Sequence, residues 1–197
     1  MNTRLLGIIV VIEAAVVTGI VQLSHLTVFP SKTAVVLIWL LPIAFGLHVA
    51  EEFALPGGFG EWYRGYRPQW ALRITPSYLL RVNVVGGAAC LLMPLGAFDY
   101  RGGYSFGGIH VWCILTSAMA FNGMLHLLGT IQTRQYSPGV VTGMAVYVPL
   151  LAVSVAYFVG TRAMILPTAI LCVVLGCVLQ PVLNYRHERA LSREQHS

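Results

Sequence analysis

Long apolar runs follow one another along the whole chain, separated by short polar or glycine- and proline-containing connections. The runs cover residues 5–23, 33–52, 76–97, 109–131, 138–159 and 164–183. At about 1.5 Å per residue, each is close to the length that a helix needs to cross the roughly 30 Å hydrocarbon core of a bilayer. The pattern therefore predicts an all-α membrane protein, a bundle of six transmembrane helices.

Proline, glycine and capping residues mark where several of these helices begin and end. Thr75-Pro76 and Ser137-Pro138 each place a hydroxyl before a proline at the first helical position. We therefore expect the third and fifth helices to begin there. Pro56-Gly57-Gly58 ends the second helix. Pro42 lies inside that helix, so it leaves the carbonyl of Ile38 without its usual N–H donor and is expected to bend the helix.

Residues 59–77 form a connection of unusual composition, rich in aromatic rings and arginines: Trp62, Tyr63, Arg64, Tyr66, Arg67, Trp70 and Arg73. This composition is typical of a segment at the membrane interface, where rings lie at headgroup level and guanidinium groups bind phosphates. It fits a plain anchoring belt, and it also fits a clamp for the headgroup of a substrate.

Composition agrees with a membrane protein of one domain. Hydrophobic residues make up 57% and charged residues 10% of the chain, with a mean hydropathy of +0.75, whereas about a quarter of a soluble domain is charged. No polar stretch is long enough for a second domain, so we expect one six-helix domain over residues 1–184 and a polar cytoplasmic tail over residues 185–197.

Charge and cysteine content narrow the class further. The net charge of +5 comes from basic residues in short loops, so it gives no indication of nucleic-acid binding. The four cysteines all lie within apolar runs. Cysteines in such positions are typical of small buried side chains rather than of disulfides or zinc clusters.

The distribution of Lys and Arg among the connections predicts the orientation of the bundle. With six helices, one side of the membrane receives nine basic residues and the other side three. Because basic loops remain in the cytoplasm, we expect both termini to be cytoplasmic. The nine are Arg4, Arg64, Arg67, Arg73, Arg81, Arg134, Arg186, Arg189 and Arg193, and the three are Lys32, Arg101 and Arg162.

Three ionisable residues lie together at the end of the second run: His48, Glu51 and Glu52. At ~100° per residue, Glu51 lies about 60° to one side of His48 and Glu52 about 40° to the other, so all three side chains can point toward one spot. Acidic residues are disfavoured at a helix C-terminus by roughly 0.3–1 kcal/mol each. A solvated helix end would more naturally carry Lys or Arg, so the position is unusual; the alternative is an ordinary polar helix end with one glutamate paired to an arginine.

Other helices bring polar residues to the same depth. In the predicted topology, Asn122 and His126 of the fourth helix lie within roughly two turns of His48 in height, at about 1.5 Å per residue. Asn83, near the start of the third helix, lies in the same layer. Glu13 lies deeper, on the first helix, and is a further candidate. Ionisable groups inside a bilayer are costly, which makes this layer a candidate functional site.

Two imidazoles with two or three carboxylates form the ligand set of a catalytic zinc site, or of a two-metal site in a helical bundle. We expect His48, Glu51 and His126 to bind a divalent metal, with zinc favoured and iron as an alternative. Glu52 would be the general base or a bridging ligand, and Asn122 would orient a ligand or polarise a substrate oxygen. Such a site requires the imidazoles of His48 and His126 to lie within roughly 3–7 Å of each other.

Three segments carry a resemblance to a known family. His48-Val49-Ala50-Glu51-Glu52 is followed by Phe121-Asn122-Gly123-Met124-Leu125-His126 and by Arg134-Gln135-Tyr136-Ser137-Pro138-Gly139. Together and in this order they resemble the HXXEE-domain family of small bacterial membrane proteins. The resemblance covers about residues 35–160.

The resemblance implies a site and a location, and no particular activity. It adds Arg134 and Tyr136 as candidate site residues, because both lie within the third matching segment. It implies a multi-pass protein of the bacterial inner membrane, in which the helix over residues 5–24 is an addition to the shorter members of the family.

Three classes of function fit these observations. The first is a metal-dependent membrane enzyme, with hydrolase-type chemistry favoured, that acts on a lipophilic or lipid-like substrate; a di-iron oxygenase is a further enzymatic option. The second is a proton-coupled small transporter, which at this size would be expected to form a homodimer. The third is a membrane scaffold subunit whose polar residues pair between helices. The metal content of the purified protein separates the first class from the other two.

Overall fold

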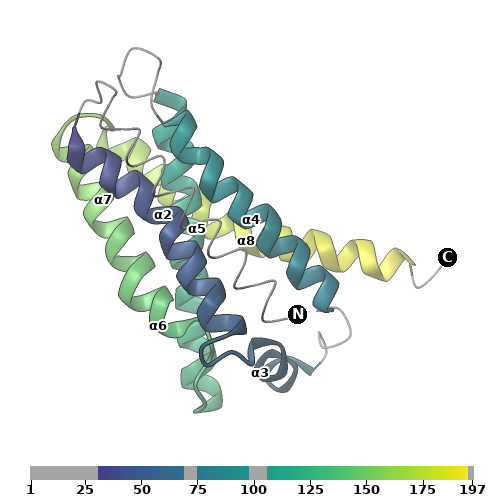
Figure 1. The fold of residues 1–197 in the computed structure, drawn as a ribbon. Helices are drawn as coiled ribbons and strands as arrows, with labels where there is room; N and C mark the ends of the chain where they lie inside the picture. The colour runs from purple at the N-terminus through teal and green to yellow at the C-terminus, as the bar shows by residue number, and fades with distance from the viewer. Residues whose placement is uncertain (1–30, 69–74, 98–105, 195–197) are drawn as a thin grey trace.

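The computed structural model describes residues 31–68, 75–97 and 106–194, and its elements there are helices (Figure 1). In chain order they are α2 (Lys32–Phe53), α3 (Phe59–Tyr66), α4 (Pro76–Gly96), α5 (Phe106–Thr133), α6 (Val140–Thr142), the π-helix η2 (Gly143–Tyr147), α7 (Val148–Gly160) and α8 (Leu166–Glu194).

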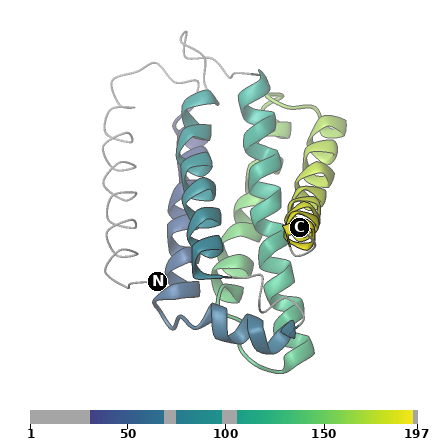
Figure 2. The ribbon, with the colours of Figure 1, turned by 90° about the vertical axis from the view of Figure 1, so that its right-hand side faces the viewer.

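The long helices form a bundle with one short helix across its end. α2, α4, α5 and the continuous α6–η2–α7 segment pack side by side, and α8 packs along α5 but runs obliquely, so that its last turns project beyond the bundle (Figure 1). α3 lies across the end of the bundle at which α2 and α5 terminate (Figure 2). The core between α2, α5 and α7 is closed by Ile38, Leu41, Trp112, Tyr147 and Phe158, each less than 2% exposed.

Four of these helical segments are long and apolar enough to cross a membrane: Lys32–Phe53, Pro76–Pro94, Gly107–Thr133 and Val140–Gly160. α8 contributes a shorter apolar helix, Leu166–Leu179. The expected first span, residues 5–23, lies outside the described residues. The prediction of an all-α protein is therefore confirmed for the described ranges, which contain four candidate membrane spans and not the full six.

The start of α2 and the free carbonyl at its proline agree with the sequence, and α2 continues as one helix through Pro42, from Lys32 to Phe53. Ser31 caps the helix by accepting a hydrogen bond from the backbone N–H of Thr33 at 3.2 Å. The carbonyl of Ile38, which Pro42 leaves without an intrahelical donor, accepts a hydrogen bond from the indole Nε1–H of buried Trp112 on α5 at 3.2 Å. A buried carbonyl without any donor would cost roughly 1–3 kcal/mol, so this contact offsets the proline and ties α2 to α5.

The two predicted cap-plus-proline starts have different outcomes. Thr75 caps α4 as expected, since its hydroxyl accepts from the backbone N–H of Tyr78 at 3.1 Å. Ser137-Pro138, in contrast, does not begin a helix, and this prediction is wrong: α6 begins at Val140 after Gly139, whose φ is +106°. The turn at Gly139 places the serine hydroxyl against an imidazole of α5 instead of against the amides of the next helix.

The fifth predicted helix is interrupted by a single π-turn where it meets α5. A Cβ atom added to Gly123 of α5 would lie 2.5 Å from the Cα atom of Gly143 in η2. The two backbones therefore touch at this crossing, which only residues without side chains permit. The contact holds the start of the fifth helix against the part of α5 that carries Asn122 and His126.

The C-terminal helix is longer than predicted. The sequence indicated an end near residue 183 followed by a polar tail, but α8 continues without interruption to Glu194. Pro181 lies within it. The polar composition after residue 184 thus marks the end of the apolar run and not the end of the helix, because charged residues with good helical propensity continue the helix beyond it.

Candidate metal centre

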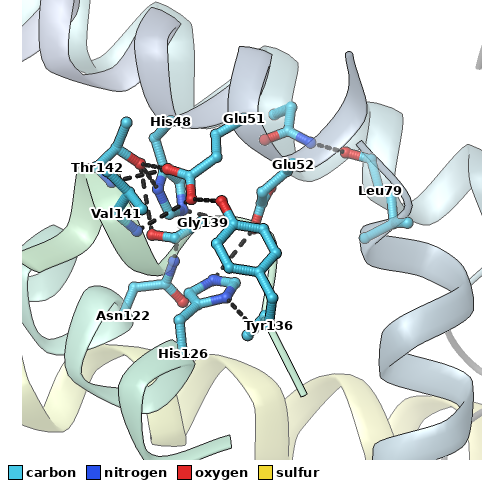
Figure 3. Close-up of polar contacts among 12 residues, drawn as sticks. His48, Glu51, Glu52, Leu79, Asn122, His126, Tyr136, Gly139, Val141 and Thr142 are labelled. Atoms are coloured by element: carbon cyan, nitrogen blue, oxygen red, sulfur yellow. Dashed lines mark hydrogen bonds and ion pairs between the residues drawn. The ribbon is translucent and has the colours of Figure 1, made fainter. Parts of the chain in front are cut away.

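α2 and α5 bring three ligand atoms together near one end of the bundle (Figure 3). Glu52 Oε1 lies 3.5 Å from His48 Nε2 and 3.2 Å from His126 Nε2. The two imidazole centroids are 5.2 Å apart, which confirms the expected approach of these side chains. All three residues are buried, and their ligand atoms lie within 4.8 Å of one another.

The register of α2 explains why these two of its residues share the cluster. His48 and Glu52 are four residues apart, so they lie one above the other on the same face of the helix. Side chains bridge from that face of α2 to α5: Trp112 donates to the Ile38 carbonyl, and Asn122 lies beside His48. One more ligand from α5 then completes a group of two nitrogen atoms and one oxygen atom.

Glu51 has a different environment and lies outside this group of ligand atoms. Its Oε1 accepts hydrogen bonds from the phenol of Tyr136 and from the backbone N–H of Val141 at 3.0 Å. Its Oε2 accepts from the backbone N–H and the hydroxyl of Thr142, at 2.7 and 2.6 Å. Both oxygens of Glu51 are thus occupied, and the carboxylate directed at the imidazoles is that of Glu52.

The free backbone amides at the start of α6 explain why the carboxylate of Glu51 lies there. The first amides of a helix have no intrahelical acceptor, and the helix dipole favours an anion there. Gly139, the N-cap residue of α6, has no side chain that can accept from them. The carboxylate of Glu51 serves instead as the cap, from a helix far away in the sequence. The unfavourable C-terminal position of Glu51 on α2 is therefore matched by a favourable N-terminal position on α6.

A hydroxyl group lies at hydrogen-bonding distance from the Nδ1 atom of each imidazole. His48 Nδ1 lies 2.8 Å from Thr142 Oγ1, and His126 Nδ1 lies 2.9 Å from Ser137 Oγ. The Nε2 atoms point the other way, toward Glu52. Asn122 lies beside the cluster, with its Nδ2 3.0 Å from His48 Nε2. This contact agrees with the expectation that Asn122 lies next to the site.

Gly139 lies directly against both imidazole rings. A Cβ atom there would be 2.8 Å from Cε1 of His48 and 2.8 Å from Cε1 of His126. Reasoning from the sequence did not single out this residue, although Pro138-Gly139 is a turn signal within one of the matching segments. No side chain fits between the turn and the two rings, so the glycine allows the turn to close over them.

α3 covers the site with aromatic rings. The rings of Phe59 and Trp62 lie 5.5 and 6.2 Å from the imidazole of His126, centroid to centroid, and the indole is nearly parallel to it, at 26°. Tyr66 stacks on Trp62 at 5.0 Å and donates to Gln132 Oε1 of α5 at 2.5 Å. The segment expected at the interface is thus in part a helix that packs on the candidate site.

The remaining candidates lie at the edge of the site or away from it. Tyr136 is 44% exposed, and its partial burial together with the carboxylate of Glu51 raises the pKa of Tyr136 to about 12, so it remains a hydrogen-bond donor at neutral pH. Arg134 is exposed and has a left-handed backbone, φ +53°, just after α5. Asn83 donates to the carbonyl of Leu79 on its own helix, and Glu13 lies outside the described residues.

Comparison with known proteins identifies the same motif. A family model described as a protein of unknown function with HXXEE motif matches residues 39–154. His48, Glu51 and Glu52 supply the motif, and the matched range also contains Asn122, His126 and the α6–η2–α7 start. No curated protein and no solved structure matches the chain.

Proposed function

The chain belongs to the HXXEE family, and from the geometry of that motif we propose that His48, Glu52 and His126 bind one divalent metal ion. The convergence of two Nε2 atoms and one carboxylate oxygen within 4.8 Å carries the proposal. Two histidines and one glutamate form a ligand set of catalytic zinc sites, which leave a fourth position open. Zinc is therefore favoured, and iron is the alternative metal.

The surroundings of the three residues support this assignment. Metal-binding histidines usually have their other ring nitrogen held by a hydrogen-bonding partner, which fixes the direction of the lone pair. Thr142 and Ser137 lie at hydrogen-bonding distance from the Nδ1 atoms of His48 and His126. A buried carboxylate between two imidazoles in an apolar bundle is also costly without a compensating charge.

We assign to the chain a metal-dependent membrane enzyme activity, with hydrolysis as the favoured reaction class. A bound divalent metal polarises an acyl or phosphoryl oxygen and lowers the pKa of water. His48 and His126 would hold it, and Asn122 would orient the substrate oxygen beside His48. Because both oxygens of Glu51 accept hydrogen bonds, Glu52 is the carboxylate available to the site: Oε1 would serve as ligand, and the other oxygen would accept a proton.

The position of the site supports a lipophilic substrate. The three residues are buried at the end of two helices that are long and apolar enough to cross a membrane. The aromatic rings of α3 cover them, and such rings belong to the interfacial region of a bilayer. A substrate with an apolar chain and a polar group at headgroup depth would meet both environments.

A proton relay is the second candidate, and one observation favours it. The contacts from Ser137 through His126, Glu52, His48, Thr142 and Glu51 to the half-exposed Tyr136 form a continuous chain of polar contacts of 3.5 Å or less. Such a chain could conduct protons in a carrier. Metal content decides between the two proposals, because the relay needs no metal.

The test of the metal site compares two histidines of α5. Protein purified in detergent should contain about one zinc ion per chain after removal of loosely bound metal. His126→Gln should lose that zinc, because it removes one of three ligands. His110→Gln is the matched control and should retain it, since His110 lies at the other end of α5 beside Thr168. Metal analysis that finds no zinc or iron in the wild type, or equal amounts in the two variants, would contradict the proposal.

The orientation that we propose places the site on the cytoplasmic side of the inner membrane, from the nine-to-three distribution of basic residues. Arg162 and Gln135 are exposed and lie in turns at opposite ends of the bundle. In intact cells, a membrane-impermeant maleimide should label Arg162→Cys but should label Gln135→Cys only after lysis. Labelling in the opposite sense would reverse the orientation.

A further inference from the structure

Thr142 makes two separate contacts with Glu51, and only one of them belongs to the helix cap. The backbone N–H of Thr142 donates to Glu51 Oε2 at 2.7 Å, as the N-terminus of any helix requires. The hydroxyl of Thr142 donates to the same oxygen at 2.6 Å. The backbone amide is sufficient for the helix cap, so the hydroxyl has a separate role. The second neighbour of the hydroxyl indicates that role.

On its other side lies His48. A hydroxyl carries one proton, and in Thr142 that proton points to Glu51, which accepts from two backbone amides and a phenol as well. Thr142 Oγ1 therefore has only lone pairs for His48 Nδ1, 2.8 Å away. The nitrogen must then be the donor, because two facing acceptors at this distance would repel each other.

We propose that Thr142 is a positioning residue: backed by Glu51, its hydroxyl keeps the proton of His48 on Nδ1 and the lone pair on Nε2. The inference rests on the proposed metal site, because the lone pair on Nε2 is what a metal needs. It explains why the HXXEE motif contains two adjacent glutamates. Glu52 contacts the Nε2 atoms of both imidazoles directly. Glu51 acts on His48 Nδ1 indirectly, through the hydroxyl of Thr142.

The geometry on the far side of the ring supports this proton position. His48 Nε2 faces the side-chain amide nitrogen of Asn122 at 3.0 Å, and an amide nitrogen is a donor only. The carboxylate oxygen Oε1 of Glu52 also lies near Nε2 but farther away, at 3.5 Å. The nearest neighbour of Nε2 is therefore a donor, and an Nε2 that carried a proton would face it unfavourably. Thr142 on one side and Asn122 on the other thus select the same tautomer of His48.

Removing the hydroxyl alone tests the inference. Thr142→Val retains the shape of the side chain and the backbone N–H that caps the helix, but has no hydroxyl. Thr142→Ser retains the hydroxyl. Thr133→Val is the matched control on α5, because the hydroxyl of Thr133 donates to the carbonyl of Gly129 in its own helix. If the valine variant does not fold, Thr142→Ala removes the same hydroxyl with less bulk.

The first readout is the ¹⁵N spectrum of the metal-free protein labelled in its histidines, with the His48 signals identified by their absence in His48→Gln. The wild type, Thr142→Ser and Thr133→Val should show a protonated Nδ1 and an unprotonated Nε2. Thr142→Val should show a mixture of tautomers. A valine variant with the same His48 tautomer as the wild type would overturn the inference, whether or not the protein binds metal.

The second readout is the affinity for zinc. Thr142→Val should bind zinc about 10–100-fold more weakly than the wild type, the range found when a supporting partner of a ligand is lost. Thr142→Ser should restore the wild-type affinity. A protein that binds no zinc would remove the proposed function and leave the tautomer experiment to decide the role of Thr142. Equal affinities in the valine variant and the wild type would contradict the positioning role.

Discussion

Replacing Gly139 with alanine is expected to abolish zinc binding and to lower the free energy of unfolding by about 2–5 kcal/mol. Two effects add. The φ of +106° is a conformation that L-residues rarely adopt, and the added Cβ would lie 2.8 Å from Cε1 of both His48 and His126. The rings cannot both move away, because their Nδ1 atoms are held by Thr142 and Ser137.

A second glycine separates these two effects. Gly58 also has a positive φ, +88°, but a Cβ there would meet nothing within 4 Å. Gly58→Ala should therefore lower the free energy of unfolding by about 1–3 kcal/mol through backbone strain alone and should retain zinc. Zinc titration and unfolding in detergent, applied to both variants, give the comparison. Wild-type zinc affinity in Gly139→Ala would show that the turn does not position the imidazoles.

The two glutamates of the motif should respond differently to the same substitution. Glu51→Gln should lower the free energy of unfolding by about 2–4 kcal/mol with or without chelator, because hydrogen bonds to a charged group contribute roughly 1.5–3 kcal/mol each. One oxygen of Glu51 faces the amide of Val141 and the other faces the amide of Thr142. In either orientation, the new NH₂ group would face a backbone N–H.

Glu52→Gln should instead change stability by about 1 kcal/mol or less in chelator-treated protein, since it removes a buried charge and retains the shape of the side chain. Its effect should appear when zinc is added. Zinc at 100 times its Kd should stabilise the wild type by about 2.7 kcal/mol and the variant hardly at all. Unfolding of both variants, with and without chelator, provides the measurement. If Glu51→Gln lost the zinc effect and retained its intrinsic stability, the roles of the two carboxylates would be exchanged.

Much of the scaffold around the site could be predicted from local patterns. The apolar runs located α2, α4 and α5 to within a few residues, because helix length and hydrophobicity are properties of a continuous segment. Pro42 predicted a free carbonyl at Ile38, since a proline lacks a donor in any context. The sequence could not name Trp112 as the replacement donor, because that contact depends on how α2 and α5 pack.

The depth of the site in the bundle could also be predicted, but the hydrogen-bond partners of its residues could not. Counting residues along helices placed His48 and His126 at one depth, and the structure brings their rings together. The helical wheel left Glu51 and Glu52 nearly equivalent, on either side of His48. The N-terminus of α6 distinguishes them, because its free backbone amides donate to the carboxylate of Glu51 and not to that of Glu52. Its position depends on the contact between Gly123 and Gly143, which no local pattern indicates.

The misplaced start of the fifth helix has the same origin. Ser137 followed by proline is a good local capping signal, and in isolation it would be expected to start a helix. Here the serine hydroxyl lies against His126, and a carboxylate from α2 caps the helix two residues later. A buried imidazole in need of a partner and a distant anion thus outweigh a local preference of about 1 kcal/mol.

The cap supplied by Glu51 also sets an order of events during biosynthesis. Glu51 is synthesised 90 residues before Val141, whose amide it accepts. A nascent chain that has inserted only α2 and α4 therefore carries a carboxylate whose donors have not yet been made. The end of α2 acquires its hydrogen bonds only when residues 136–142 emerge and fold back against it. This end of the bundle can therefore be completed only after both α2 and the start of α6 have been synthesised.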